Sequence, residues 1–166
     1  MRIDVSFFVA LEPHAQGRPR AALVAGRADV YKPSEDRRHE SAFALLASSS
    51  RPVGDDGAAV TIAEPVVLDV VIVQPRPASL SARSKRTGLP LKPPGRRWAS
   101  SRPDLDNLGK TVLDALKGWW VDDALVVGLR AFKVIAALGE APGYHVRIRA
   151  ASAWRALVQV EDSDDQ

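Results

Sequence analysis

The sequence contains no cysteine, only three histidines and a single methionine among its 166 residues. The absence of cysteine excludes disulfides, thiolate zinc sites, iron–sulfur clusters and cysteine nucleophiles. The histidines, His14, His39 and His145, are far apart along the chain, so we expect no histidine-rich metal site. No apolar run approaches the length of a membrane span, so no membrane partner is expected. Any chemistry must therefore rest on carboxylates, amines, guanidinium groups or hydroxyls.

The length of the chain predicts one domain, because single domains commonly have about 150 residues. We place this domain in residues 1–160 and treat residues 161–166, EDSDDQ, as an acidic tail. The N-terminal segment MRIDVSFFVALEP has an acidic residue inside its apolar stretch and no cleavage-like segment after it. We therefore expect no signal peptide and a cytoplasmic protein.

The net charge of +3 conceals an uneven distribution of charge along the chain. Four of the 20 acidic residues lie in the last six positions, whereas none of the 23 basic residues does. The body of the chain is therefore distinctly basic, which favours a polyanionic partner such as nucleic acid. Composition alone favours the other interpretation, an ordinary soluble surface.

Hydrophobic spacing predicts an α+β fold, a single domain with one mixed β-sheet and two main helices. The segment 65–73, PVVLDVVIV, suits a central strand because it is β-branched and almost continuously apolar. We expect the first helix to begin after an N-cap at Ser34, and to bury Ala42, Phe43, Leu45 and Leu46. The predicted elements are strands at 2–11, 65–73, 125–135 and 144–149, a hairpin at 21–32, and helices from 34 to about 48 and at 104–117.

Residues 74–103 differ from the rest of the chain because they combine six prolines and eight basic residues with no acidic residue. This composition predicts a basic, proline-rich loop. The loop and the earlier GRPR segment at 17–20 are candidate phosphate contacts, since arginine offers a two-pronged donor to phosphate. A solvated basic loop is the alternative. The candidate DNA-binding residues are Arg18, Arg20, Arg76, Arg83, Lys85, Arg86, Arg96, Arg97 and Arg102.

Four carboxylates, Asp104, Asp106, Asp122 and Asp123, stand at the start of the second predicted helix and just after it. Carboxylates gathered from such places are the oxygen ligands that Mg²⁺ prefers. A helix of about 13 residues spans about 20 Å, so the turn at Gly118 must fold the chain back before Asp123 can approach Asp104. The alternative is structural, with Asp104 as an N-cap, Asp106 as a first-turn acid and the Asp pair as a turn.

Lys110 lies four residues after Asp106 and projects from the same helix face. It is a candidate for offsetting charge at a scissile phosphate, or else one member of an exposed i,i+4 ladder that continues to Asp114. Trp119 and Trp120 could stack on bases, but core packing of at least one of them is the more natural interpretation. The basic loop runs directly into Asp104, and this juxtaposition favours a metal site that cuts a polyanion.

The segment RPDLDNLGKTVLDALKGWWVDDALV, at 102–126, closely resembles the signature of the RusA-type Holliday-junction resolvases. That signature is a P-D-x-D-N-x-x-K helix start, then L-D-A-L, a short turn and a D-D pair before a strand. The GRPR segment, the YKP tripeptide at 31–33 and the strand PVVLDVVIV also resemble parts of the family. The resemblance runs from about residue 3 to residue 150.

The resemblance implies a homodimeric crossover junction endodeoxyribonuclease that nicks opposing strands of a four-way junction and leaves 5′-phosphate and 3′-hydroxyl ends. It implies catalytic residues at Asp104, Asp106, Asp123 and Lys110. It also implies Mg²⁺ as cofactor, with Mn²⁺ as a substitute, held by the three aspartates and, less firmly, Asp122. A less selective branched-DNA or flap nuclease and a catalytically silent DNA-binding module are the alternatives. We expect the dimer contact on the strands at 125–135 and 144–149, together with residues 151–160.

Overall fold

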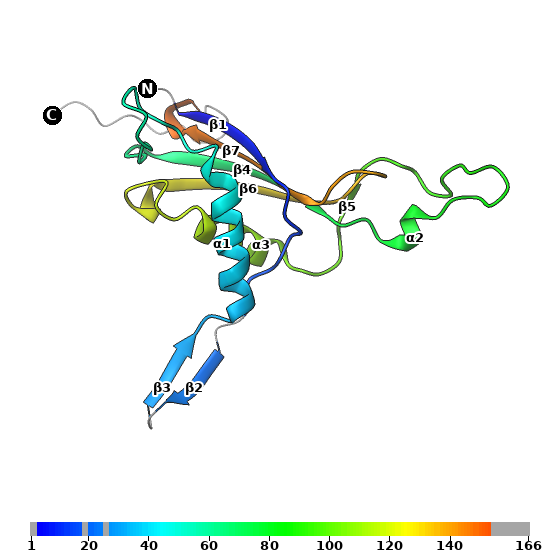
Figure 1. Ribbon diagram of the computed structural model, residues 1–166, viewed down its shortest axis with the longest axis horizontal. Helices are drawn as coiled ribbons and strands as arrows, with labels where there is room; N and C mark the ends of the chain where they lie inside the picture. Colours follow the sequence, from blue (N-terminus) through cyan, green and yellow to red (C-terminus); the bar gives the residue numbers. More distant parts are fainter. Residues whose placement is uncertain (1–2, 18–19, 25–26, 154–166) are drawn as a thin grey trace.

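The computed structural model describes residues 3–17, 20–24 and 27–153, and the acidic tail lies outside these ranges. A five-stranded mixed sheet, with strand order β1-β7-β4-β6-β5, forms the centre of the molecule (Figure 1). The fold is thus a small α+β domain, as predicted. The elements are β1 Asp4–Val9, β2 Arg20–Val24, β3 Arg27–Tyr31, α1 Ser34–Ser48, β4 Val66–Gln74, α2 Ala78–Ser81, β5 Arg97–Trp98, α3 Leu105–Ala115, the 3₁₀ turn η1 Asp123–Leu125, β6 Val126–Ile135, β7 Gly143–Ala150 and η2 Ala151–Ala153.

The central strand β4 pairs in parallel with β6 and antiparallel with β7. Its residues Leu68, Val70 and Ile72 are fully buried in the main core. On the opposite face, Asp69 accepts hydrogen bonds from Arg130 of β6 and Arg149 of β7. Burial opposes ionisation of Asp69, but these two guanidinium groups prevail and lower the pKa of its carboxyl. The acid that interrupts the apolar strand has therefore found the partners that a buried charge requires.

Both long helices, α1 and α3, cover the same face of the sheet (Figure 1). Helix α1 begins at Ser34 with Pro33 in the N-cap position, so the prediction of a Ser34 cap was wrong. Phe43 and Ala47, one helical turn apart, are fully buried against the sheet. Leu45 is 74% exposed and Leu46 48% exposed, against expectation, because they lie on the flank of α1 that no element covers.

Helix α3 is shorter than the predicted 104–117 and ends at Ala115, with Gly118 at a φ of +88° in the turn that follows. Leu108, Val112 and Leu116 form the predicted apolar stripe and are fully buried. Trp119 and Trp120 are each only 4% exposed, which confirms core packing. The backbone of Trp119 and Val121 bonds to Ile62, which ties the turn after α3 to the segment before β4.

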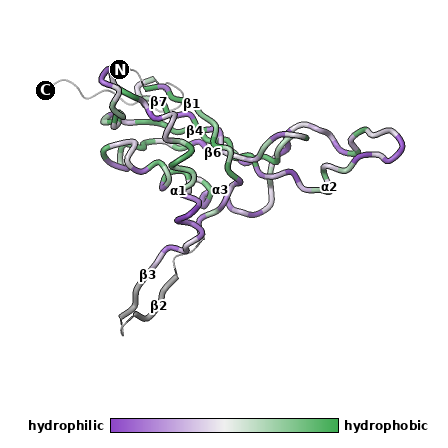
Figure 2. Tube along the Cα trace, in the orientation of Figure 1, coloured by the Kyte–Doolittle hydropathy of each residue, from purple (hydrophilic) through white to green (hydrophobic). Residues whose placement is uncertain are grey.

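Two segments extend away from this body (Figure 1). The β2–β3 hairpin forms a separate two-stranded sheet next to the start of α1, which confirms the hairpin prediction. The segment between β4 and β5 forms a long arm, here defined as residues 75–103, whose far end is hydrophilic (Figure 2). This arm was predicted as a plain loop but contains the short helix α2 and the short strand β5. Within the described ranges, no helix is long and apolar enough to cross a membrane.

Candidate functional site

The predicted acidic residues at the start of α3 are fully accessible from solvent. Asp104 occupies the N-cap position with an extended backbone, and its side chain makes no capping hydrogen bond to the described part of the chain. Asp106 stands in the first helical turn, where the helix dipole favours a negative charge. Both side chains are exposed, so this end of α3 presents two carboxylates with unused lone pairs.

Lys110 lies beside Asp106, with 3.5 Å between its Nζ and the Asp106 carboxylate. The two side chains are 59% and 67% exposed, so this i,i+4 contact contributes only a few tenths of a kcal/mol, about 0.3 to 0.5. Asp114 does not continue a ladder from Lys110. It turns instead to Lys117, Lys32 and Gln16.

The start of α3 is held against the sheet by Lys133 of β6. Its Nζ donates to the carbonyl oxygens of Ser101 and Pro103, at 2.5 Å each. This ammonium group therefore fixes the last residues before Asp104 and sets where the two carboxylates lie. Lys133 was not predicted as a site residue. The available signal was a single lysine in an otherwise apolar strand, FKVI, on the sheet face that the helices cover.

Asp122 and Asp123 lie at the opposite end of α3. The Asp122 side chain accepts a hydrogen bond from Ala124 N at 2.8 Å and caps the short turn η1. Asp123 accepts a hydrogen bond from the indole of Trp120 at 2.9 Å and lies near Lys117. Asp122 is thus occupied as a turn residue, whereas Asp123 remains exposed and keeps lone pairs for another ligand.

The structure therefore brings Asp104 together with Asp106, and Asp122 with Asp123, but it separates the two pairs. An α-helix of the 11 residues of α3 is about 16 Å long. Among the described residues, no three His, Asp or Glu side chains come close enough to share a metal ion. The oxygen donors at the start of α3 suit Mg²⁺ in kind, but within one chain they supply two carboxylates rather than three.

The predicted DNA contacts differ in how far the fold already uses them. Arg76 donates to the carbonyl oxygens of Leu80, Pro93 and Ala136 and so holds the base of the arm together. Arg83 donates to Gly88 O, and Arg96 forms an ion pair with Glu140. The remaining cations are exposed and make no hydrogen bond or ion pair within the described part of the chain: these are Lys85, Arg86, Arg97 and Arg102.

Two predicted contacts cannot be placed in this site. Arg18 lies outside the described residues. Arg20 begins β2, where its backbone pairs with Tyr31, and only its backbone is described. The GRPR segment as a DNA contact therefore stays a prediction.

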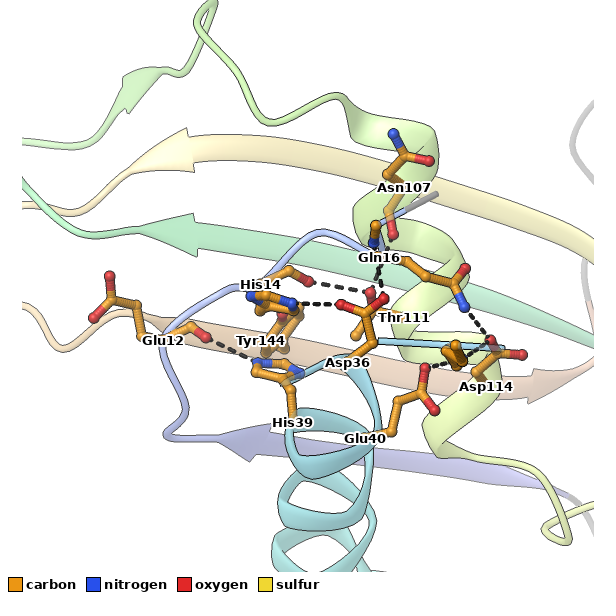
Figure 3. A network of polar contacts seen from close by, with 12 residues as sticks. Glu12, His14, Gln16, Asp36, His39, Glu40, Asn107, Thr111, Asp114 and Tyr144 are labelled. Atoms are coloured by element: carbon orange, nitrogen blue, oxygen red, sulfur yellow. Dashed lines mark hydrogen bonds and ion pairs between the residues drawn. The ribbon is translucent and has the colours of Figure 1, made fainter. Parts of the chain in front are cut away.

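Sequence reasoning assigned no role to the histidines, but His14 and His39 belong to a polar network between α1, α3 and the segment after β1 (Figure 3). His14 Nε2 lies 2.7 Å from Asp36 Oδ1, and the other Asp36 oxygen accepts from Gly17 N at 3.0 Å. Asp36 is only 3% exposed. The phenol of buried Tyr144 accepts from His14 N, and burial raises its pKa well above the usual range. This network fixes the segment that leads to the β2–β3 hairpin.

A second group of contacts surrounds Asp114 at the middle of the α1–α3 interface. Its carboxylate accepts hydrogen bonds from Gln16 and from Lys32, which comes from the hairpin side, each at 2.7 Å. Burial raises the pKa of this carboxyl, but hydrogen bonds from Lys117, Lys32 and Gln16 outweigh burial and lower the pKa to about 2. Asp114 is therefore a structural acid, as predicted.

With this geometry described, two comparisons with known proteins are informative. The family model described as "Endodeoxyribonuclease RusA" matches residues 10–149, which include β4, the arm, α3 and both pairs of aspartates. The chain belongs to the RusA endodeoxyribonuclease family. A Bacillus subtilis (strain 168) protein named "Uncharacterized protein YqaN" is similar to it, at 35% identity over 150 residues, covering 90% of this chain and 98% of the relative.

Membership in the RusA family makes the chain an endodeoxyribonuclease, an enzyme that hydrolyses DNA. The family match extends across the whole body of the fold and stops short of residues 151–166. It gives the exposed carboxylates at the start of α3 a chemical context, because cutting a phosphodiester requires charge stabilisation at the phosphate.

Proposed function

We propose that this RusA-family chain is a Mg²⁺-dependent, structure-selective DNA endonuclease of the cytoplasm that resolves four-way junctions by paired symmetric nicks. The nicks leave 5′-phosphate and 3′-hydroxyl ends. The observation that supports this proposal most directly is the position of Asp104 and Asp106. They are exposed, they have spare lone pairs, and they follow directly on a basic arm within the segment that the family model matches.

In this proposal Asp104, Asp106 and Asp123 hold the metal ion, and Asp122 stays a turn residue beside them. When bound, Mg²⁺, or Mn²⁺ in its place, would polarise the scissile phosphate and activate the attacking water. Lys110 projects from the same helix face as Asp106 and offsets the negative charge that develops on the phosphate. Lys133 acts as a positioning residue, because it anchors the backbone immediately before Asp104.

The phosphate backbone of the junction is held by the exposed cations of the arm, above all Lys85, Arg86, Arg97 and Arg102. The arm extends away from the sheet (Figure 1), so its cations can reach DNA that also contacts the start of α3. A homodimer follows from the reaction, because two symmetric nicks require two sites and a twofold axis matches the symmetry of the junction.

The proposal is tested with a labelled four-way junction and a linear duplex of the same sequence, each incubated with and without Mg²⁺. We expect junction cleavage that needs Mg²⁺, little duplex cleavage, and products that a ligase can reseal. The variant Asp106→Asn is the matched control, because it removes one ligand and keeps the size of the side chain. Equal cleavage of flaps and junctions would favour the less selective nuclease, and binding without cleavage would favour the silent module.

A further inference from the structure

The outer edge of β6 is mostly unpaired. Strand β5 pairs with β6 only at Val134 and Ile135, next to the contact of Ala99 N with Lys133 O. Toward its start, β6 has no strand on its outer side within the described ranges. Such an edge offers a row of backbone donors and acceptors to another strand.

The surface along this edge is apolar at its centre. Val127 is 60% exposed and Leu129 40% exposed, and both line a groove between β6 and the flank of α3. The groove also includes Leu113 and Trp120. Exposed apolar side chains beside an open strand edge favour a protein partner, since a DNA backbone would require cations at the centre of the surface.

The two separated pairs of aspartates lie at the two ends of this edge. Asp123 begins the short turn that leads directly into Val126, the first residue of β6. Asp104 follows Pro103, whose carbonyl is bonded to Lys133 near the other end of the same strand. Strand β6 and helix α3 thus run in opposite directions between the two half-sites.

We propose that β6 pairs antiparallel with β6 of a second copy about a twofold axis near Leu129. Each metal site is then completed by Asp104 and Asp106 of one subunit with Asp123 of the partner subunit. The inference rests on the proposed function, because it assigns the partner that completes that site. The partner copy is required, since the described chain alone does not gather these three acids.

The geometry of antiparallel pairing brings the half-sites together without further rearrangement. Residues equally far from the axis face each other, so Lys133 lies level with Leu125 of the partner subunit. Paired strands are about 4.8 Å apart, and a twofold axis perpendicular to the sheet leaves both α3 helices on the same face. Asp123 of the partner subunit therefore arrives beside the segment that Lys133 holds, which ends in Asp104.

The strand topology also selects β6 over β7 as the dimer contact. Both strands were predicted to contribute, but β7 lies inside the sheet, paired with β1 on one side and β4 on the other. Only β6 keeps an open edge. The joined sheet would continue through ten strands and would remove two exposed edges at once.

Subunit mixing tests whether the site is shared. Asp106→Asn and Asp123→Asn are co-expressed with different tags, and the doubly tagged heterodimer is isolated. A shared site predicts that each homodimer is inactive, whereas the heterodimer nicks at about half the wild-type rate because one of its two sites is complete. The heterodimer should leave single nicks rather than paired cuts. An inactive heterodimer, or failure of any heterodimer to form, overturns the proposal.

Cross-linking provides a readout that is independent of activity, and the cysteine-free chain makes it clean. Leu129→Cys and Val127→Cys are oxidised in solution, with Leu45→Cys on the exposed flank of α1 as control. We expect at least a tenfold excess of disulfide dimer for a β6 variant over the control. Val127→Lys should convert the dimer to monomer, whereas Leu45→Lys should not. If the wild type cleaves junctions but neither β6 cysteine cross-links preferentially, the interface is wrong and the nuclease stands. If cross-linking succeeds without cleavage, the interface stands and the proposed function fails.

Discussion

Asp36 and Asp106 occupy the same place in their helices, the first turn, but the fold uses them in opposite ways. Asp36 is 3% exposed, and both of its oxygens accept short hydrogen bonds. The Asp106 side chain is 67% exposed, and its contact with Lys110 is 3.5 Å long. The helix dipole favours both charges equally, so the difference comes from what packs against each helix.

The comparison separates carboxylates that hold the chain together from carboxylates that are available to a ligand. Asp36, Asp69 and Asp114 have their lone pairs saturated by protein donors, and removing any one of them would leave those donors without partners. Asp104 and Asp106 have capacity to spare. The first group should therefore govern stability, and the second should govern cleavage.

The largest expected effect is on catalysis. Asp104→Asn and Asp106→Asn should each lower junction cleavage by orders of magnitude, because each removes a metal ligand while keeping the size of the side chain. Junction binding should persist or improve, since negative charge near the phosphates is lost. Cleavage is measured on a labelled junction and binding by gel shift, and thermal denaturation should show an unchanged melting temperature. A variant that cuts at the wild-type rate would remove that residue from the site.

The second effect is on stability. Asp36→Ala should lower the free energy of unfolding by about 2 to 4 kcal/mol, because it leaves His14 and the Gly17 amide without their buried acceptor. Urea denaturation followed by circular dichroism measures the change. The control is Glu35→Ala, an exposed acid in the same helical turn, which should shift the value by less than about 0.5 kcal/mol. Equal effects of the two variants would break the distinction between saturated and available acids.

The sequence was sufficient for the elements and the order of the fold, because hydrophobic spacing reports local periodicity. Both ends of α1 and the bounds of β4 were predicted to within about one residue. Spacing could not reveal that the flank of α1 carrying Leu45 stays uncovered, since this depends on how many elements the sheet face accommodates. It also could not reveal β5, a two-residue strand that exists only because β6 lies beside it.

The candidate site was predicted in its residues but not in its assembly. The sequence contains the turn at Gly118, but its direction is set by tertiary bonds between Trp119, Val121 and Ile62. These bonds return the chain to the sheet at the far end of α3, so Asp123 stays remote from Asp104 within one chain. Lys133 was missed for the same reason, because its acceptors, Ser101 and Pro103, are about 30 residues away in sequence and adjacent only in the fold.

The third effect sharpens the comparison for the cations of the arm. Replacing Lys85, Arg86, Arg97 and Arg102 with Gln should weaken junction binding and reduce its salt dependence. Each lost phosphate contact removes about 0.9 from the slope of log affinity against log salt concentration. The slope is measured by fluorescence anisotropy over a salt series. A matched control replaces Arg37 and Arg38, exposed on α1, and an equal reduction there would mean that charge matters only in total.

The smallest effect concerns acid. Lys117, Lys32 and Gln16 hold the pKa of Asp114 at about 2, below the usual value, so the folded state binds this proton less readily than the unfolded chain does. The stabilisation by Asp114 is therefore complete above the unfolded pKa near 4 and is lost as the pH falls through the folded pKa. With the partial exposure of the group taken into account, we expect a loss of about 1 to 2 kcal/mol over that window. Asp114→Asn should lose this part of the pH dependence of the unfolding free energy, whereas Glu35→Gln, which also removes one exposed negative charge, should keep it. An unchanged acid profile in Asp114→Asn would mean that the acid holding α3 to the hairpin side is no more committed to the fold than Asp106.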